Sequence, residues 1–282
     1  MSNLVSVVIP CFNAGMTLGE AIESVLRQTY ADIEIIVVDD GSTDLGTREI
    51  IASAHWPKTR VIHQENAGPA AARNRAIEAS SGEFILPLDA DDTIEPTYVE
   101  KAVAAMRADA NVGIVYCKAL KFGAESGPWG LPAYSLRELV IDNVIFVTSL
   151  FRRADWELVN GFNQSLRRGV EDYEFWVKIV ALGRDVIQLD EYLFNYRIQQ
   201  TSRTTNFSSD RAAVVATYAH IFRDNVQFFA KNAEYLFEHR FGLYDELLAY
   251  RARYGWINGL IERHPWLKSF ARACHRLLFR LQ

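Results

Sequence analysis

Residues 4–40 read LVSVVIPCFNAGMTLGEAIESVLRQTYADIEIIVVDD. The segments 4–10 and 33–40 are β-branched apolar runs, which are typical of buried strands. Between them, residues 16–29 place leucine, isoleucine and valine side chains at helical spacing. Two strands joined by a helix form a βαβ unit with parallel strands, so this stretch predicts an α/β fold.

The alternation of strands and helices continues beyond this first unit. Residues 59–63 and 83–89 predict two further strands, and helices are expected at 47–54 and 68–80. Another helix is expected to begin at Pro96, because proline is favoured in the first turn of a helix. The pattern predicts a parallel sheet with helices on both faces, in which ligands bind at the carboxyl ends of the strands.

Acidic side chains follow two of the predicted strands at this end. The segment LPLDADD (86–92) crowds Asp89, Asp91 and Asp92, and VVDDGSTD (37–44) follows the second strand. Like charges at this spacing repel one another unless water or a cation screens them. An Asp-x-Asp pair can bind a hard divalent cation, which in turn neutralises a diphosphate. The alternative is a solvated turn.

Composition and motifs exclude several classes of protein. The 282-residue chain has a formal net charge of -5, which argues against nucleic acid as a partner. The three cysteines lack CxxC spacing, so neither a zinc site nor a disulfide framework is expected. No GxGxxG follows the first strand and no GxxxxGK[ST] occurs, which disfavours dehydrogenases and P-loop proteins. Without a secretory leader or a long apolar run, a cytoplasmic protein is expected.

Four motifs occur in a fixed order: VSVVIPCFNAGMTLGEAIESVLRQTY, IEIIVVDDGSTD, NAGPAAARNRAIEASSGEFILPLDADD and GFNQSLRRGVEDYEFWVKI. Together they resemble the inverting family 2 glycosyltransferases of the GT-A fold, over residues 4–203. The resemblance implies a Rossmann-like GT-A catalytic domain at 1–205 and a helical C-terminal region at 206–282. Its nucleotide-sugar-binding half would span 1–115 and its acceptor-binding half 116–205.

The resemblance also implies the donor site. Phe12 would lie near the base, and Asp39 would accept a hydrogen bond from the pyrimidine imide. The implied nucleotide-sugar-binding residues are Pro10, Phe12, Asn13, Asp39, Asp40, Arg73, Asp89 and Ala90. For Asp39 and Asp40 the alternative is a capping role in the turn before Gly41, and for Arg73 it is an exposed helix cation. Asp91 and Asp89 would hold Mn²⁺ or Mg²⁺, with Gln199 where many relatives carry a histidine. Asp92 is expected to cap the following turn.

The implied reaction is transfer of a hexose from a nucleotide sugar, with UDP as the default nucleotide. The acceptor would be a saccharide or a lipid-linked saccharide, in the synthesis of a cell-surface polysaccharide or glycolipid. Asp172 would be the catalytic base, with Glu171 beside it. Trp176, Arg197 and Arg203 are expected on the acceptor side, where Trp176 has a core aromatic as its alternative.

Two other functions fit parts of the pattern. A GT-A nucleotidyltransferase would need a basic loop after the first strand, and residues 10–20 contain no Lys or Arg. A non-catalytic nucleotide-sugar-binding protein would not need all four of Asp39, Asp89, Asp91 and Asp172. Measuring donor hydrolysis or sugar transfer would distinguish such a binding protein from an enzyme.

The C-terminal region predicts two to four helices and almost no strand. The last helix is expected to begin near Pro265, with cations at 268, 272, 276 and 280 beside an apolar stripe. This pattern predicts peripheral contact with the inner face of a membrane through residues 265–282. The alternative is a helix packed on the catalytic domain.

Overall fold

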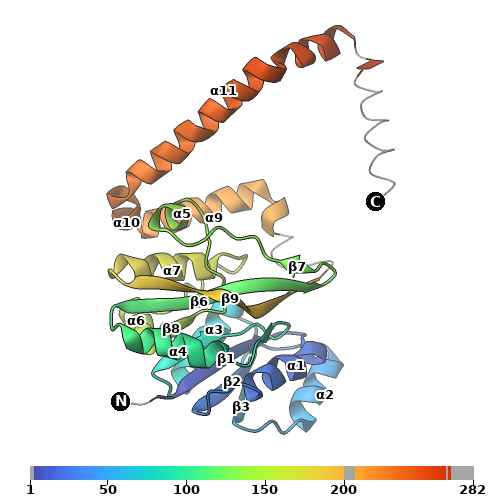
Figure 1. The fold of residues 1–282 in the computed structure, drawn as a ribbon. Coiled ribbons are helices and arrows are strands. Elements are labelled where there is room, and N and C mark those ends of the chain that lie inside the picture. The colour runs from blue at the N-terminus through green and yellow to red at the C-terminus, as the bar shows by residue number, and fades with distance from the viewer. Residues whose placement is uncertain (1–2, 200–206, 265, 268–282) are drawn as a thin grey trace. The chain divides into compact units, whose positions relative to one another are not determined.

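The computed structural model describes residues 3–199, 207–264 and 266–267. Within them, a mixed nine-stranded sheet organises the N-terminal part of the chain (Figure 1). The order along the sheet is β3-β2-β1-β4-β8-β6-β9-β5, and β7 pairs with β6. The strands are β1 (Val5–Cys11), β2 (Ile33–Asp39), β3 (Thr59–His63), β4 (Phe84–Pro87), β5 (Thr93–Ile94), β6 (Val112–Gly123), β7 (Gly127–Pro128), β8 (Leu150–Arg152) and β9 (Asp185–Ile198).

Helices connect the strands and extend the chain beyond the sheet. They are α1 (Gly15–Leu26), α2 (Leu45–Ser53), α3 (Pro69–Ala79), α4 (Tyr98–Ala108), α5 (Leu136–Ile141), α6 (Arg153–Leu158), α7 (Glu171–Ala181), α9 (Arg211–Asp224), α10 (Val226–Lys231) and α11 (Ala233–Arg263). The strands and helices expected up to residue 108 are all present, with ends that differ by a few residues. The expected α/β fold with a helical C-terminal segment is therefore confirmed.

The first four strands pair in parallel, as their sequence predicts. β1 lies between β2 and β4, with Cys11 opposite Asp39 and Val8 opposite Pro87. β1 and β2 are almost entirely buried, which explains their continuous apolar sequences. Because parallel strands end at the same edge, the loops after β1, β2 and β4 come together there.

The second half of the sheet is mixed. β8 pairs antiparallel with both β4 and β6, and β6 pairs in parallel with the long strand β9. Figure 1 shows α7 and α4 on opposite sides of these strands. β5 pairs antiparallel with β9, with Thr93 opposite Asn195. This pairing brings the end of β9 against the acidic loop that follows β4.

The chain divides into two compact units, residues 1–231 and 232–282. Helix α9 belongs to the first unit, where the Tyr218 ring contacts that of Tyr173 of α7 in a tilted arrangement, with centroids 5.5 Å apart, and its hydroxyl donates a hydrogen bond to Asp142. The first unit thus extends past residue 205, and a catalytic domain ending there stays a prediction. The described part of the second unit is dominated by the 31-residue helix α11. Among the described residues, no helix combines the length and hydrophobicity needed to cross a bilayer.

Candidate functional site

A groove of about 620 Å³ lies at the carboxyl ends of β1, β2 and β4. We call it the strand-end groove. It is lined by Pro10, Cys11, Phe12, Asn13, Ala14, Asp40, Asn66, Gly68, Pro69, Arg73, Asp89, Ala90, Asp91, Arg167 and Gln199. Nine residues that the sequence marks as donor or metal site residues are among them, drawn from segments that are far apart in the chain. Asp39 is the expected donor residue that lies just outside this lining.

The loop after β1 gives the groove one apolar and one polar element. Phe12 is 48% exposed and lines the groove. The Asn13 side-chain oxygen accepts hydrogen bonds from the backbone N–H groups of Thr43 and Asp44, at 2.7 and 3.2 Å. Asn13 therefore ties the first loop to the DDGSTD turn, and leaves the Phe12 ring available to a flat ligand.

Two adjacent aspartates after β2 have different surroundings. Asp40 accepts hydrogen bonds from the backbone N–H groups of Ala67 and Gly68, at 2.9 and 2.8 Å, and shapes the loop before α3. Asp39 accepts one from the Ser42 N–H at 3.0 Å and lies 3.1 Å from His63 Nδ1. Burial alone would raise the pKa of Asp39, but the hydrogen bonds from Ser42 and His63 outweigh it and lower the pKa. Asp39 is thus an ionised acceptor.

The acidic loop after β4 concentrates negative charge. Burial and the neighbouring Asp89 raise the pKa of Asp91. Burial, followed by Asp91 and Asp89, raises the pKa of Asp92 well above its usual value. Asp92 is only 1% exposed and accepts a hydrogen bond from the Arg197 backbone N–H at 2.8 Å. It therefore fastens the loop to β9, whereas the sequence predicts a cap on the next turn.

Arg197 supports this loop from behind. Its Nε donates to the Asp91 carbonyl at 2.7 Å, and its guanidinium pairs with Glu20 and lies 4.3 Å from the Phe122 ring centroid. Arg197 lines neither the groove nor the cavity described below, so its expected place on the acceptor side stays a prediction that neither lining supports. Gln199 donates from its amide Nε2 to Asp91 Oδ2 at 2.6 Å, and so presents nitrogen rather than a ligand oxygen to this carboxylate. Arg203 lies outside the described residues.

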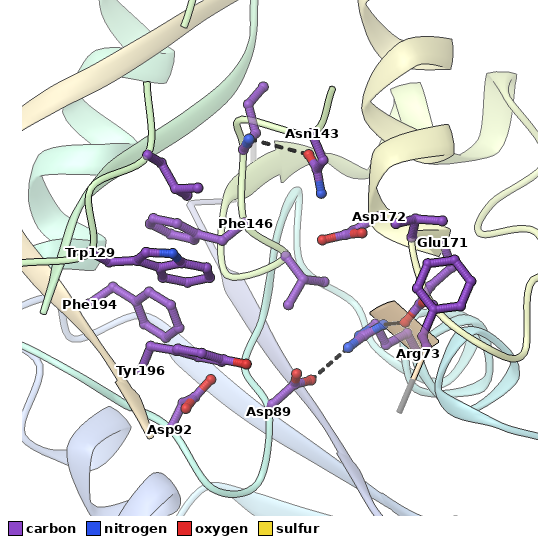
Figure 2. Close-up of a pocket in the computed structure, with 16 residues that line it drawn as sticks. Arg73, Asp89, Asp92, Trp129, Asn143, Phe146, Glu171, Asp172, Phe194 and Tyr196 are labelled. Carbon is purple, nitrogen blue, oxygen red and sulfur yellow. Dashed lines mark hydrogen bonds and ion pairs between the residues drawn. The ribbon is translucent and has the colours of Figure 1, made fainter. Parts of the chain in front are cut away.

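Arg73 links the acidic loop to α7. Its guanidinium is 1% exposed and donates to Asp89 at 2.6 Å and to Glu171 at 2.7 Å (Figure 2). The two carboxylates raise the pKa of Arg73 although burial opposes this, so the guanidinium stays charged. The alternative of an exposed helix cation is wrong, because α3 directs Arg73 into the protein. A buried bridge of this kind fixes the positions of both carboxylates.

Arg73 and Asp89 also line a second cavity of about 200 Å³, which we call the aromatic cavity. Figure 2 shows Trp129, Phe146, Phe194 and Tyr196 on one side and Asn143, Asp172, Glu171 and Arg73 on the other. The rings form a continuous wall, with centroid distances of 4.4 Å for Trp129–Tyr196 and 4.6 Å for Phe146–Phe194. Apolar surface facing a few polar groups is typical of small-molecule sites.

Strained backbone positions the acids of α7 at this cavity. Val170, directly before the helix, has φ 58° and ψ 23°. A β-branched residue rarely adopts this left-handed conformation, so the surrounding structure must impose it. The turn places Glu171 against Arg73 and directs the Asp172 carboxylate toward the cavity (Figure 2). Asp172 Oδ1 accepts the Tyr173 N–H at 2.8 Å, which orients the carboxylate.

Several expectations change once the site is assembled. Trp176 is fully buried and donates from its indole nitrogen to the Ile145 carbonyl at 3.0 Å. It is a core residue and cannot flank a bound sugar, so its alternative assignment was the better one. The sequence reasoning missed Arg167, an exposed cation that lines the groove together with the buried Arg73, and all four rings of the aromatic wall. Arg167 lies within the motif of residues 161–179, but nothing in the motif singles it out, and the four rings are spread over segments that only the fold brings together.

The acidic loop offers carboxylates to a divalent cation but does not supply a complete set of ligands. Within the described ranges, no group of three or more His, Cys, Asp or Glu residues could hold a metal by itself. However, Mg²⁺ is commonly held by one or two carboxylates together with substrate phosphates. Asp89 and Asp91 supply those carboxylates, and their mutual repulsion would be relieved by a cation. The residues therefore fit a metal that is bound together with a diphosphate.

Comparison with known proteins identifies a sequence family and several structures of similar fold. Residues 6–159 match the family profile described as Glycosyl transferase family 2. A chondroitin synthase from Escherichia coli is 34% identical over 186 residues, which are 64% of this chain and 27% of that protein. This chain thus spans about a quarter of that relative's length.

Two solved structures share the fold. S. aureus TarS 1-349 in complex with UDP-GlcNAc has a TM-score of 0.61 and 22% identity, over 72% of this chain and 60% of that one. The mannosyltransferase PcManGT from Pyrobaculum calidifontis, in complex with GDP-Man and Mn²⁺, has a TM-score of 0.58 and 22% identity, over 80% and 68%. At these identities the likeness shows the fold alone.

Proposed function

The chain belongs to glycosyl transferase family 2, and from this we propose that it transfers one sugar from a UDP-sugar to a saccharide or lipid-linked saccharide, with inversion. The observation that carries the proposal is the meeting of two cavities at one pair of side chains. Arg73 and Asp89 line both the strand-end groove and the aromatic cavity. A donor in the groove and an acceptor in the cavity would therefore meet beside Asp172.

We assign the nucleotide to the groove. The exposed ring of Phe12 offers a stacking surface for a base, and the ionised Asp39 beside it can accept a hydrogen bond from an imide N–H. Arg167 supplies positive charge for the diphosphate. The UDP-GlcNAc complex of the structural neighbour TarS supports a UDP-sugar as donor.

Asp89 and Asp91 would hold Mn²⁺ or Mg²⁺ against the diphosphate. When bound, this cation supplies charge neutralisation for the departing nucleoside diphosphate. The Mn²⁺ in the PcManGT complex supports such an assignment. Gln199 would have to turn its amide oxygen toward the cation to act as a ligand, and we propose for it the lesser role of orienting Asp91.

We assign the chemical step to Asp172. Its carboxylate takes the proton of the acceptor hydroxyl while that oxygen forms a bond to the anomeric carbon. The bond from the anomeric carbon to the diphosphate breaks on the opposite face, and the nucleoside diphosphate leaves with the electron pair. Glu171 does not take the proton, because its carboxylate is buried in the ion pair with Arg73. Glu171 instead positions Asp172 and Arg73.

The acceptor would lie against the aromatic wall. A sugar ring has apolar C–H faces and polar hydroxyl edges, which match a cavity with rings on one side and carboxylates on the other. The E. coli relative is named a chondroitin synthase, which supports a saccharide acceptor in the synthesis of a surface polysaccharide or glycolipid.

We retain one proposal from the sequence for the end of the chain. Residues 265–282 carry cations beside an apolar stripe and would contact anionic lipid, where each cation contributes up to about 1 kcal/mol. Of this segment only Trp266 and Leu267 are among the described residues. Cosedimentation of full-length and 1–264 proteins with anionic vesicles tests it: equal binding of the two would remove this segment from the contact.

The main experiment combines binding and turnover. Purified protein is screened by thermal shift against UDP-, dTDP- and GDP-sugars with Mn²⁺, Mg²⁺ or EDTA, since a ligand of the folded state raises the melting temperature. We expect stabilisation by a UDP-sugar that EDTA abolishes, followed by donor hydrolysis or transfer to an oligosaccharide. The anomeric configuration of the product, read by NMR, tests inversion. Stabilisation without any turnover would favour a non-catalytic binding protein.

A further inference from the structure

Helix α11 carries a second periodic pattern that the proposed reaction does not use. Apolar side chains recur at alternating spacings of four and three residues: Leu243, Leu247, Tyr250, Tyr254, Ile257 and Ile261. We call these six residues the α11 seam. A spacing that averages 3.5 residues keeps a stripe on one side of a helix, and this period is the signature of a left-handed coiled coil.

The seam is accessible along its length. Leu243, Leu247, Tyr250 and Tyr254 are 54, 42, 58 and 39% exposed, and the two isoleucines are partly exposed. Large apolar side chains grouped in this way mark an interaction surface, whereas isolated ones need no explanation. A neighbouring stripe consists of Phe237, Phe241, Tyr244 and Leu248. It ends there because the next two positions at the same spacing are Arg251 and Gly255, so the seam is the longer of the two.

The helix also needs a partner on energetic grounds. Its 31 residues include Gly242, Gly255 and Gly259, and each glycine costs a helix about 1 kcal/mol relative to alanine. Most helical stability in proteins comes from packing of an apolar face. An apolar seam along a helix that contains three glycines is consistent with stabilisation by association.

The charges beside the seam favour one kind of partner. With Leu247, Tyr254 and Ile261 at heptad position a, Glu246 occupies position g and Arg251 the next position e. In a parallel coiled coil, a g residue of one chain faces the following e residue of the other. Two copies of α11 in parallel register would therefore place Glu246 against Arg251 twice. Within one helix these residues are five apart and do not face each other.

We propose that the protein self-associates, and that the partner of the α11 seam is the seam of a second copy of this chain in parallel register. Residues 233–263 give a rod of about 46 Å, long enough for four heptads.

The first test uses matched variants of the full chain. Leu247→Glu with Tyr254→Glu places two carboxylates in the seam, while Ala249→Glu with Ala252→Glu adds the same charge to the opposite side. Light scattering coupled to gel filtration is expected to give twice the chain mass for the wild type and the control, and the single mass for the seam variant. Near-UV circular dichroism, unchanged in the seam variant, shows that the first unit is still folded.

A charge swap tests the register. Glu246→Arg is expected to raise the dissociation constant about 2- to 5-fold, and adding Arg251→Glu to restore it. A wild type that is monomeric throughout a concentration series overturns the proposal, whether its seam packs on its own chain or binds phosphatidylserine vesicles. A seam variant that stays dimeric overturns it as well. None of these results depends on whether the protein transfers a sugar.

Discussion

The strand-end groove and the aromatic cavity share two residues and otherwise differ in construction. The groove is built from short loops at the ends of β1, β2 and β4, and presents carboxylates, backbone amides and one exposed cation side chain, Arg167. The cavity is built largely from segments between residues 129 and 207, and four aromatic rings dominate one wall. This contrast suits the proposed reaction between a charged donor and a hydroxyl-rich acceptor.

The largest effect is expected from a substitution at Asp172, beside the residues that the two sites share. Asp172→Asn removes the proposed base while keeping the shape and the Tyr173 hydrogen bond. We expect transfer to fall by about 10²- to 10⁴-fold, the usual contribution of general acid–base catalysis. Nucleotide binding, measured by calorimetry, is expected to stay within a few fold. Near-normal turnover in this variant would remove Asp172 from the base role.

A second variant isolates the groove. Asp91→Asn cannot balance a divalent cation, so UDP affinity in Mn²⁺ is expected to fall about 10- to 100-fold, to the value measured in EDTA. Asp190→Asn, at an 88% exposed carboxylate, is the matched control and should bind as the wild type does. Unchanged manganese dependence in Asp91→Asn would mean that this carboxylate is not a ligand.

The groove could be predicted from the sequence to a large extent, whereas the cavity could not. Asp40, Asp89 and Asp91 directly follow strands whose apolar runs are unmistakable, and parallel pairing brings such strand ends together. The aromatic wall has no comparable signal. Trp129 follows the two-residue edge strand β7, and Tyr196 lies within β9, where an aromatic is ordinary.

Individual charges were hardest to predict, because their roles depend on pairing across distant segments. Arg73 is an ordinary helix cation in the sequence, yet its partner Glu171 is 98 residues away. Trp176 was ambiguous for a similar reason. Helical spacing places it one turn from Asp172 on the same face of the helix, but neighbouring segments cover the indole, which is fully buried and donates to the Ile145 carbonyl.

Two alanine variants test whether the donor and the acceptor bind at separate sites. Phe12→Ala is expected to raise the donor KM about tenfold and leave the acceptor KM unchanged, because an aromatic contact contributes about 0.5–1.5 kcal/mol beyond its buried area. Trp129→Ala should do the reverse. Steady-state kinetics with each substrate varied in turn measures both. If either variant raised both constants equally, the two sites would not be separate.

The smallest expected effect concerns stability. It distinguishes repulsion among the carboxylates of the acidic loop from a buried carboxylate that is paired with a cation. The pKa of Asp92 is raised in the folded state, so the folded protein holds a proton that the unfolded chain has released at about pH 4 and above. The free energy of unfolding therefore falls as the pH rises from about 4 through the raised pKa. At neutral pH Asp92 destabilises the folded protein, whether its carboxyl group is protonated or charged. An asparagine in its place would still accept the Arg197 N–H through its amide oxygen.

We expect Asp92→Asn to melt above the wild type at pH 7.5, and each 1 kcal/mol gained would raise the melting temperature by about 2–4 °C in a domain of this size. The gain should vanish below about pH 4, and shrink in Mn²⁺ with UDP, because a cation relieves the same repulsion. Asp155→Asn is the contrasting variant: Asp155 is equally buried but held by Arg184 at 2.6 and 3.0 Å, so its loss should lower the melting temperature. If both variants lowered it, the acidic loop would be structural and the repulsion at Asp92 would not be a feature of the binding site.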